Sequence, residues 1–236
     1  MEQNRTWGLS GGTLKIIALI TMIIDHATYI FIDYGSNRSW YLLGRGIGRL
    51  AFPIYCFLIV EGFYHTRSVL KYAFRLFLFA LLSEIPFNLA FYGTVLYPKH
   101  QNVFFTLLLG VILMYLVQYA RTRMTQEKVV LQTIVLLLFY GGAFLAANLL
   151  QADYGMNGVI LILLMYLFRG RKFCVALLDI MMNLAMGMGG SIQRFGAYSA
   201  IPISCYNGRK GISLKYFFYL IYPLHLLTFY WIKTVI

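Results

Sequence analysis

The sequence predicts an all-α fold, a single domain over residues 1–236 built as a polytopic transmembrane helical bundle of about nine spans. Hydrophobic residues make up 60% of the chain and charged residues 12%, whereas about a quarter of the residues in an ordinary soluble domain are charged. Apolar runs of about 20 residues, the length of a membrane-spanning helix, follow one another with short polar connections between them. The basic residues fall on alternate connections, which is the positive-inside pattern of a protein whose N-terminus is cytoplasmic.

The expected elements follow these apolar runs in order. The first run is longer than the apolar core of a cleaved signal peptide, about 7 to 15 residues, so we expect it to remain as a span. The seventh and eighth runs are short and interrupted by glycines, which is typical of broken helices that line a cavity. The polar connections 92–101 and 152–155 are placed to cover such a cavity on the outer side. We expect spans near residues 13–32, 42–64, 70–91, 102–119, 129–150, 155–168, 173–188, 194–206 and 214–232.

The net charge of +12 follows from this topology and does not indicate nucleic-acid binding. Bases on cytoplasmic connections meet anionic lipid headgroups, so membrane lipids are the expected partners and the cell membrane is the expected location. The cysteines lack the spacing of a zinc site, and no metal is expected. The bases predicted on the cytoplasmic side are Arg67, Lys71, Arg121, Arg123, Lys128, Arg169, Arg171, Lys172, Arg209, Lys210 and Lys215.

Acidic residues are rare and are concentrated in the predicted membrane region. Only eight residues are Asp or Glu, and Asp25, Glu61, Glu84, Asp153 and Asp179 lie within or beside apolar runs. An ionisable side chain at membrane depth costs a few kcal/mol or more, and it normally faces a polar cavity or a partner. Asp25, with His26 next to it in the middle of the first span, therefore marks a candidate site.

Helix geometry predicts partners for this pair. A rise of about 1.5 Å per residue places Asp25, His26, Arg49, Glu84 and His225 in one layer, roughly 17 to 22 Å from the cytoplasmic ends of their helices. Neighbouring residues on a helix point about 100° apart. We therefore expect His26 to face a cavity, while Asp25 pairs with Arg49 or another base on an adjacent helix.

Three further contacts are expected from spacing. Tyr222 and His225 are three residues apart and share a helix face. Glu61 and Arg75 lie nearer the cytoplasmic side, where they are expected to form a structural ion pair. The GRGIG segment, residues 44–48, has no strand context for a nucleotide-binding loop, so it favours close helix packing, either within one chain or in a homodimer.

The polar layer suits catalysis of group transfer. A histidine such as His26 can act as a general base toward a hydroxyl or amine, or as a nucleophile that carries an acyl group. Arg49 can stabilise an oxyanion, and the basic cytoplasmic rim suits the phosphates of a nucleotide-like donor. A proton-coupled transporter or flippase could use Asp25, Glu84 and His225 as a relay, and a noncatalytic assembly factor is a third alternative.

Longer motifs run along nearly the whole chain: LKIIALITMIIDH, GRLAFPIYCFLIVEGFYHTR, KYAFRLFLFALLSEIPFNL, NVFFTLLLG, DYGMNGV, IPISCYNGRKG and FFYLIYPLHL. In this order they closely resemble the TraX family of multi-pass membrane proteins, whose founding member is associated with N-terminal acetylation of conjugative pilin. The family is similar to the larger transmembrane acyltransferases of the acyltransferase-3-like group. The resemblance implies an acetyltransferase that moves an acetyl group from cytoplasmic acetyl-CoA to a peptide amine or glycan hydroxyl at the outer face.

The resemblance also implies roles for individual residues. The larger enzymes carry an Arg in the first helix and, eleven residues later, a His regarded as catalytic; here Lys15 and His26 have that spacing, although Lys lacks the bidentate fork of Arg. The expected catalytic layer is His26, Asp25, Arg49, Glu84 and His225. The residues expected to bind the donor are Lys15, Arg75, Arg209 and Lys210, and those expected to bind the acceptor are Asn88, Asn102, Asp153 and Tyr222.

Overall fold

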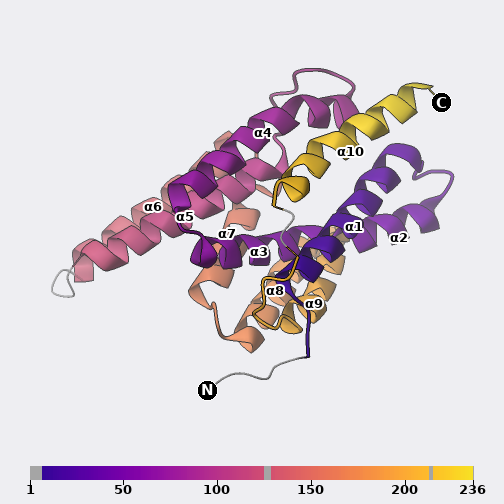
Figure 1. Ribbon diagram of the computed structural model, residues 1–236. Helices are drawn as coiled ribbons and strands as arrows, with labels where there is room; N and C mark the ends of the chain where they lie inside the picture. The colour runs from indigo at the N-terminus through magenta and orange to yellow at the C-terminus, as the bar shows by residue number, and fades with distance from the viewer. Residues whose placement is uncertain (1–6, 125–128, 213–214, 236) are drawn as a thin grey trace.

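The computed structural model describes residues 7–124, 129–212 and 215–235, and the regular elements within them are all helices (Figure 1). Helices α4, α5 and α6 lie side by side, α10 lies beside α4, and α1 lies beside α2. The elements are α1 (Gly11–Phe31), α2 (Arg38–Gly48), α3 (Ala51–His65), α4 (Val69–Tyr92), α5 (Val103–Arg123), α6 (Val129–Leu149), α7 (Gly155–Leu167), α8 (Lys172–Met186), η2 (Met188–Gly190), η3 (Ile192–Ser199), α9 (Ala200–Ser204) and α10 (Lys215–Val235).

The multi-pass membrane bundle is confirmed. Five helical stretches in the described residues are long and apolar enough to cross a membrane: α1, the stretch formed by α2 and α3, α4, α5 and α6. Each matches one predicted span, and α10, with 21 residues, matches the last one. The elements α7 and α8 have 13 and 15 residues and are shorter than the roughly 20 residues of a full crossing.

The predicted span over residues 194–206 is wrong. This part of the chain forms the 3-10 helix η3 and the five-residue helix α9. Its buried polar side chains bond to α8: Ser199 Oγ lies 2.6 Å from Asp179 Oδ2, and Gln193 Nε2 donates to Asn183 Oδ1 at 2.8 Å. The segment folds against α8 because these polar groups find partners there, which an apolar run through lipid would not provide.

Polar side chains cap several of the helices. Ser10 Oγ accepts a hydrogen bond from the backbone N–H of Thr13 at the start of α1, at 3.1 Å. Asn102 Oδ1 accepts from the N–H of Phe104 at the start of α5, also at 3.1 Å. These side chains satisfy N–H groups that have no partner within the helix. Gly93 ends α4 in the left-handed region, with φ 67°, as glycine commonly does.

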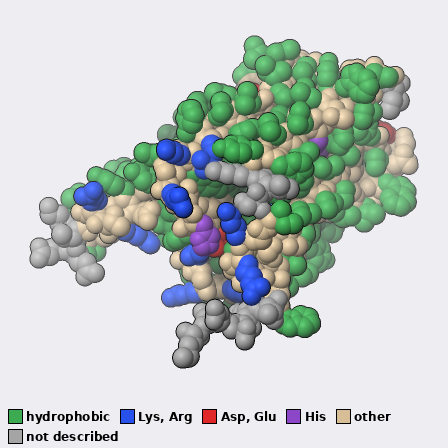
Figure 2. Space-filling view, in the orientation of Figure 1, with side chains coloured by type: hydrophobic (Ala, Val, Ile, Leu, Met, Phe, Trp, Pro, Cys, Tyr) green, Lys and Arg blue, Asp and Glu red, His purple; other side chains and the backbone are tan. Residues whose placement is uncertain are grey.

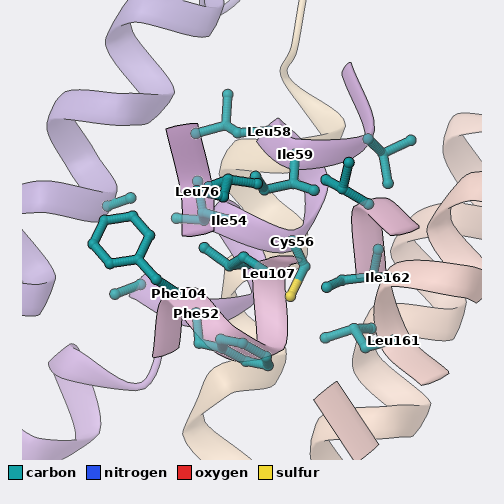
Figure 3. Packing of buried hydrophobic residues seen from close by; sticks show 14 of the residues in the cluster. Phe52, Ile54, Cys56, Leu58, Ile59, Leu76, Phe104, Leu107, Leu161 and Ile162 are labelled. Carbon is teal, nitrogen blue, oxygen red and sulfur yellow. The ribbon is translucent and has the colours of Figure 1, made fainter. Parts of the chain in front are cut away.

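Helix α3 forms the centre of the hydrophobic core (Figure 3). It packs against α1, α5, α7 and η3, so most of its side chains are covered on all sides. Ile54 and Cys56 are fully buried. By contrast, Ala147 is the only buried residue described on α6, so that helix presents its apolar surface outward, as expected for a lipid-facing span.

Basic side chains are unevenly distributed over the face of the molecule that Figure 2 draws. Figure 2 shows Lys and Arg side chains over the lower left of the visible face and mostly hydrophobic side chains elsewhere. The predicted pair between Glu61 and Arg75 is wrong, because Glu61 pairs with Arg169, through Nε to Oε1 at 2.8 Å and Nη2 to Oε2 at 3.2 Å. The Arg75 guanidinium lies over the Tyr72 ring instead, 5.7 Å from its centroid.

Candidate functional site

The site begins where α2 lies directly against α1. A Cβ atom at Gly44 would lie 2.1 Å from Thr28 Oγ1, and one at Gly48 would lie 2.2 Å from Asp25 Oδ1. Only glycine fits at such separations, because real Cβ contacts are longer than 3.0 Å. The prediction that the GRGIG segment packs helices closely is confirmed, and the packing is within one chain.

This close approach brings Arg45 of α2 and Arg49, the residue that caps the end of α2, to one buried carboxylate. Asp25 Oδ2 accepts from Arg45 Nη1 at 2.6 Å and from Arg49 Nη2 at 2.5 Å. Arg45 and Arg49 are four residues apart and therefore share a helix face. The expected pair between Asp25 and Arg49 is present, and Arg45 adds a second base. Two guanidinium groups and one carboxylate leave this cluster with a net positive charge.

On another side of α1, His26 meets His225 of α10. His26 Nδ1 lies 2.8 Å from His225 Nε2, and His225 Nδ1 lies 2.7 Å from the carbonyl oxygen of Ile221. A carbonyl can only accept, so a neutral His225 carries its proton on Nδ1 and accepts at Nε2. His26 must then donate from Nδ1. Its unprotonated Nε2, with a free lone pair, is left for the cavity.

A cavity of about 250 Å³ lies beside this histidine pair. Its wall combines charged groups from α1 and α2 with aromatic rings from α3, α4 and α10, which suits an organic ligand with both polar and flat surfaces. The described residues contain no cluster of three or more His, Cys, Asp or Glu side chains arranged to hold a metal ion. The cavity is lined by Met22, Asp25, His26, Tyr29, Arg45, Gly48, Arg49, Ala51, Phe52, Tyr55, Phe87, Phe91, Tyr92, His100, Val103, Asp153, Tyr154 and Tyr222.

The two connections expected to cover a cavity contribute to its wall. They are joined by a β-bridge between Gln101 and Ala152, and His100 Nε2 lies 3.5 Å from Asp153 Oδ1. The hydrogen bond to Asp153 raises the pKa of His100 above its usual range, against the opposing effect of burial. The connections are therefore held together most firmly when His100 is protonated.

Tyr154 is held in the cavity wall by contacts on both its ring and its hydroxyl group. The ring stacks on Phe52 with 3.5 Å between centroids, and Arg49 Nη1 donates to the hydroxyl oxygen at 3.2 Å. Its backbone has φ 62°, in the left-handed region that a bulky residue rarely adopts. Gly158 leaves room for it, because a Cβ there would lie 2.9 Å from Tyr154 Cβ.

Glu84, Asn88 and Asn102 lie near the cavity but are not among the residues that line it. Asn102 Nδ2 donates to Glu84 Oε2 at 2.5 Å and to the carbonyl of Ala80 at 2.8 Å. Asn88 Nδ2 donates to the carbonyl of Val95 at 3.2 Å. These contacts join α4 to the start of α5 and to the outer connection. The predicted acceptor residues Asp153 and Tyr222 do line the cavity.

The bases predicted to bind a donor lie apart from the cavity. The backbone of Arg209 and Lys210 accepts hydrogen bonds from the N–H groups of Gly11 and Gly12 at 2.8 and 2.9 Å, which brings this segment to the start of α1. Lys15 Nζ lies 5.6 Å from the centroid of the Phe218 ring. Arg75 lies on α4, which packs against α10, the helix that carries Phe218. The eleven residues from Lys15 to His26 correspond to roughly 16 Å along α1.

Arg45, His100 and Tyr154 are among the cavity residues that the sequence did not indicate as part of the site. Arg45 was detectable from its spacing of four residues to Arg49, which places both on one face. His100 lies in the polar connection that was expected to cover the cavity. Tyr154 had no such signal, because neither its left-handed backbone nor its contact with Arg49 follows from the local sequence.

Comparison with known proteins assigns the chain to a family. It is 26% identical over 251 residues to the "Probable fimbrial assembly protein FimC, serogroup H1" of Dichelobacter nodosus, in an alignment that covers 94% of this chain and 95% of that protein. No solved structure matches it. The TraX protein family matches residues 10–233, almost the whole chain and all the elements that build the cavity. The chain therefore belongs to the TraX family.

Proposed function

We propose that this protein is a membrane-embedded acetyltransferase that moves an acetyl group from cytoplasmic acetyl-CoA to an acceptor at the outer face. The acceptor is a glycan hydroxyl or a peptide amine. Family membership supports the proposal, as does the name of the Dichelobacter nodosus relative, which is described as a probable fimbrial assembly protein. We also propose that the protein lies in the cell membrane with the basic ends of its helices in the cytoplasm.

The observation that carries the proposal is the chain of hydrogen bonds from the Ile221 carbonyl through His225 to His26. Neutral imidazole has one donor and one acceptor nitrogen, so this chain leaves a lone pair on His26 Nε2 at the cavity wall. The arrangement resembles the role of the third member of a catalytic triad, which selects the tautomer of the catalytic histidine. Here a backbone carbonyl acts through a second histidine.

The proposed step uses His26 as a general base. Nε2 takes the proton from the acceptor hydroxyl or amine while its oxygen or nitrogen attacks the thioester carbonyl carbon. The carbon–sulfur bond then breaks, and the leaving thiolate receives the proton from His26. Alternatively, Nε2 attacks the thioester carbon, the carbon–sulfur bond breaks, CoA leaves as the thiolate, and the Nδ1 proton passes to His225. The acceptor then attacks the acetyl carbon and the bond to Nε2 breaks. The proton returns from His225 to Nδ1, and the proton lost by the acceptor neutralises the thiolate. Both routes end with an acetylated acceptor and free CoA.

The positive charge beside His26 supports the same chemistry. Arg45 and Arg49 share the single carboxylate of Asp25, and the surplus positive charge favours negative charge that develops on a carbonyl oxygen. At the other end of α1, Lys15, Arg209 and Lys210 are the residues we propose for the donor phosphates, together with Arg75 on α4. Lysine and arginine suit that role because their hydrogen bonds to phosphate are charge-assisted.

The proposal is tested by reconstituting the protein with radiolabelled acetyl-CoA and envelope extract from the organism that encodes it. We expect His26→Ala to abolish label transfer while its unfolding temperature stays near that of the wild type. His65→Ala is the matched control, because the His65 side chain is 60% exposed and does not line the cavity. Transfer by His26→Ala at the wild-type rate would remove His26 from the mechanism.

Acetyl-CoA binding separates this proposal from a transporter. A ligand that binds only the folded state at 100 times its Kd stabilises it by about 2.7 kcal/mol, so acetyl-CoA is expected to raise the unfolding temperature more than CoA-free acetate does. No stabilisation would favour the proton-coupled transporter. Mass spectrometry of envelope polymers and secreted peptides, from cells with and without the protein, identifies the acceptor by the missing acetyl group.

The proposed orientation is tested through Cys205, which is exposed and lies beside the basic segment at residues 209–210. A membrane-impermeant thiol reagent is expected to label it in inside-out vesicles and not in intact cells. Labelling in intact cells would place the basic end outside.

A further inference from the structure

The hydrogen bond from Arg49 limits the directions in which the hydroxyl proton of Tyr154 can point. Arg49 Nη1 lies 3.2 Å from the hydroxyl oxygen, and a guanidinium group can only donate. The Tyr154 oxygen therefore accepts in this contact, and its own proton cannot point at Arg49. Because Tyr154 lines the cavity, the proton is available to a ligand there. The donated bond from a cation also polarises the O–H group and makes it a stronger donor.

The backbone at Tyr154 is an independent sign of a functional position. Its φ of 62° is accompanied by φ 50° at Gln151, and non-glycine residues rarely adopt such conformations. The surroundings hold Tyr154 there: its ring stacks on Phe52, and the hydroxyl of Thr106 donates to the carbonyl of Asp153. Strain that neighbouring contacts maintain is concentrated at active sites and ligand clamps.

The charges beside Tyr154 indicate what its hydroxyl group can stabilise. Arg45 and Arg49 carry two positive charges against the one negative charge of Asp25. Asp153, the nearest carboxylate along the chain, pairs with His100. An oxygen atom that gains negative charge next to the Tyr154 hydroxyl would therefore lie on the positive side of the cavity.

We infer that Tyr154 is a further catalytic residue of this site, the hydrogen-bond donor for the oxyanion formed on the thioester carbonyl, and that Arg49 is its positioning residue. The inference rests on the proposed acetyl transfer. When the acceptor attacks the acyl carbon, the carbonyl electron pair moves onto oxygen and the Tyr154 O–H group donates to it. As the carbonyl forms again, the thiolate leaves and takes the proton held by His26. Tyr154 keeps its own proton throughout.

The test is Tyr154→Phe, which keeps the ring that stacks on Phe52 and removes the hydroxyl group, that is, both its proton and the oxygen that accepts from Arg49. With radiolabelled acetyl-CoA and envelope extract, kcat is expected to fall about 100- to 1000-fold, as for other lost oxyanion donors, while the KM for acetyl-CoA stays unchanged. Tyr119→Phe is the matched control, because Tyr119 is 53% exposed near the end of α5. It is expected to transfer acetyl at the wild-type rate.

A second measurement covers the case in which Tyr154→Phe unfolds. Replacing Tyr154 by 3-fluorotyrosine strengthens the phenol as a donor without removing it, so a catalytic hydroxyl is expected to change kcat and the high-pH limb of the rate profile. A purely structural tyrosine would leave both unchanged, and that result would overturn the inference. Wild-type kcat in a folded Tyr154→Phe variant would overturn it too, while leaving the proposed acetyl transfer in place. No transfer by the wild-type protein would overturn the proposed function itself.

Discussion

Gly48→Ala tests whether the contact between α1 and α2 builds the site. The new Cβ would lie 2.2 Å from Asp25 Oδ1 and from Asp25 Cβ. To reach an ordinary contact, α2 must move by about 1 Å, which would lengthen the bonds from Arg45 and Arg49 to about 3.5 Å, beyond good hydrogen-bond distance. Breaking a buried ion pair costs about 3 to 5 kcal/mol, and replacing glycine in a helix returns at most about 1 kcal/mol.

The expected net loss is therefore about 2 to 4 kcal/mol, or roughly 5 to 15 °C in unfolding temperature for a chain of this size. Unfolding in detergent is followed with a thiol-reactive dye in a Cys174→Ser/Cys205→Ser background, where the dye reports exposure of the fully buried Cys56. Gly141→Ala is the control, because a Cβ there meets nothing within 4 Å. If Gly48→Ala unfolds at or above the wild-type temperature, the packing argument is refuted.

Two further predictions concern titratable groups. Because the pKa of His100 is raised in the folded state, its contribution to stability is fully present below the unfolded pKa of about 6.5 and is lost as the pH rises through the folded pKa. The unfolding temperature of the wild type should therefore fall over that pH range. The unfolding temperature of His100→Asn should not show this fall. An unchanged pH profile in His100→Asn would contradict this. The unfolding temperature of Asp179→Asn should lie within a few degrees of the wild-type value, because the amide can donate to Ser199 as a protonated acid does. Asp179→Ala should lose about 1 to 3 kcal/mol of unfolding free energy, because the partners of Asp179 are left without their hydrogen bonds. Equal losses of unfolding free energy in Asp179→Asn and Asp179→Ala would refute the inference that Asp179 is protonated.

The prediction for Asp179 depends on the number of protons available to the hydrogen bonds around it. Ser199 Oγ lies 2.6 Å from both Asp179 Oδ2 and the carbonyl of Gly196, but a hydroxyl group has one proton to donate. Both contacts are full two-centre hydrogen bonds when Asp179 carries a proton and donates it to Ser199 while Ser199 donates to Gly196. Asn183 Nδ2 donates to Asp179 Oδ1 at 2.9 Å, so the neutral acid satisfies the whole network.

The sequence predicted the spanning helices well because a membrane helix is a local property. Each requires about 20 apolar residues in a row, and that condition is visible in α1, α4, α5 and α6 without any knowledge of their neighbours. The 3-10 helix η3 could not be predicted in this way. Its conformation depends on hydrogen bonds from Gln193 and Ser199 to α8, and the local sequence does not show which helix will receive them.

The errors in pairing have one geometric cause. Counting residues along a helix gives the depth of a side chain, but it does not give the direction in which the helix is turned. Glu61 and Arg75 lie at compatible depths, yet α3 directs Glu61 at Arg169. Glu84 was placed at the depth of His26 by the same count, and its carboxylate bonds to Asn102 beside the cavity.

The same geometry explains why Asp25 and His26, which are neighbours on α1, contact different helices. Because neighbouring positions point about 100° apart, Asp25 meets the arginines of α2 while His26 meets His225 of α10. The carboxylate therefore pairs with the arginines rather than orienting the histidine, and a backbone carbonyl sets the tautomer through His225. A carboxylate bonded to His26 would stabilise its protonated form. Separating the two leaves a neutral imidazole beside a positive cluster, which suits the general base proposed above, because that base would have to release its proton again to the leaving thiolate.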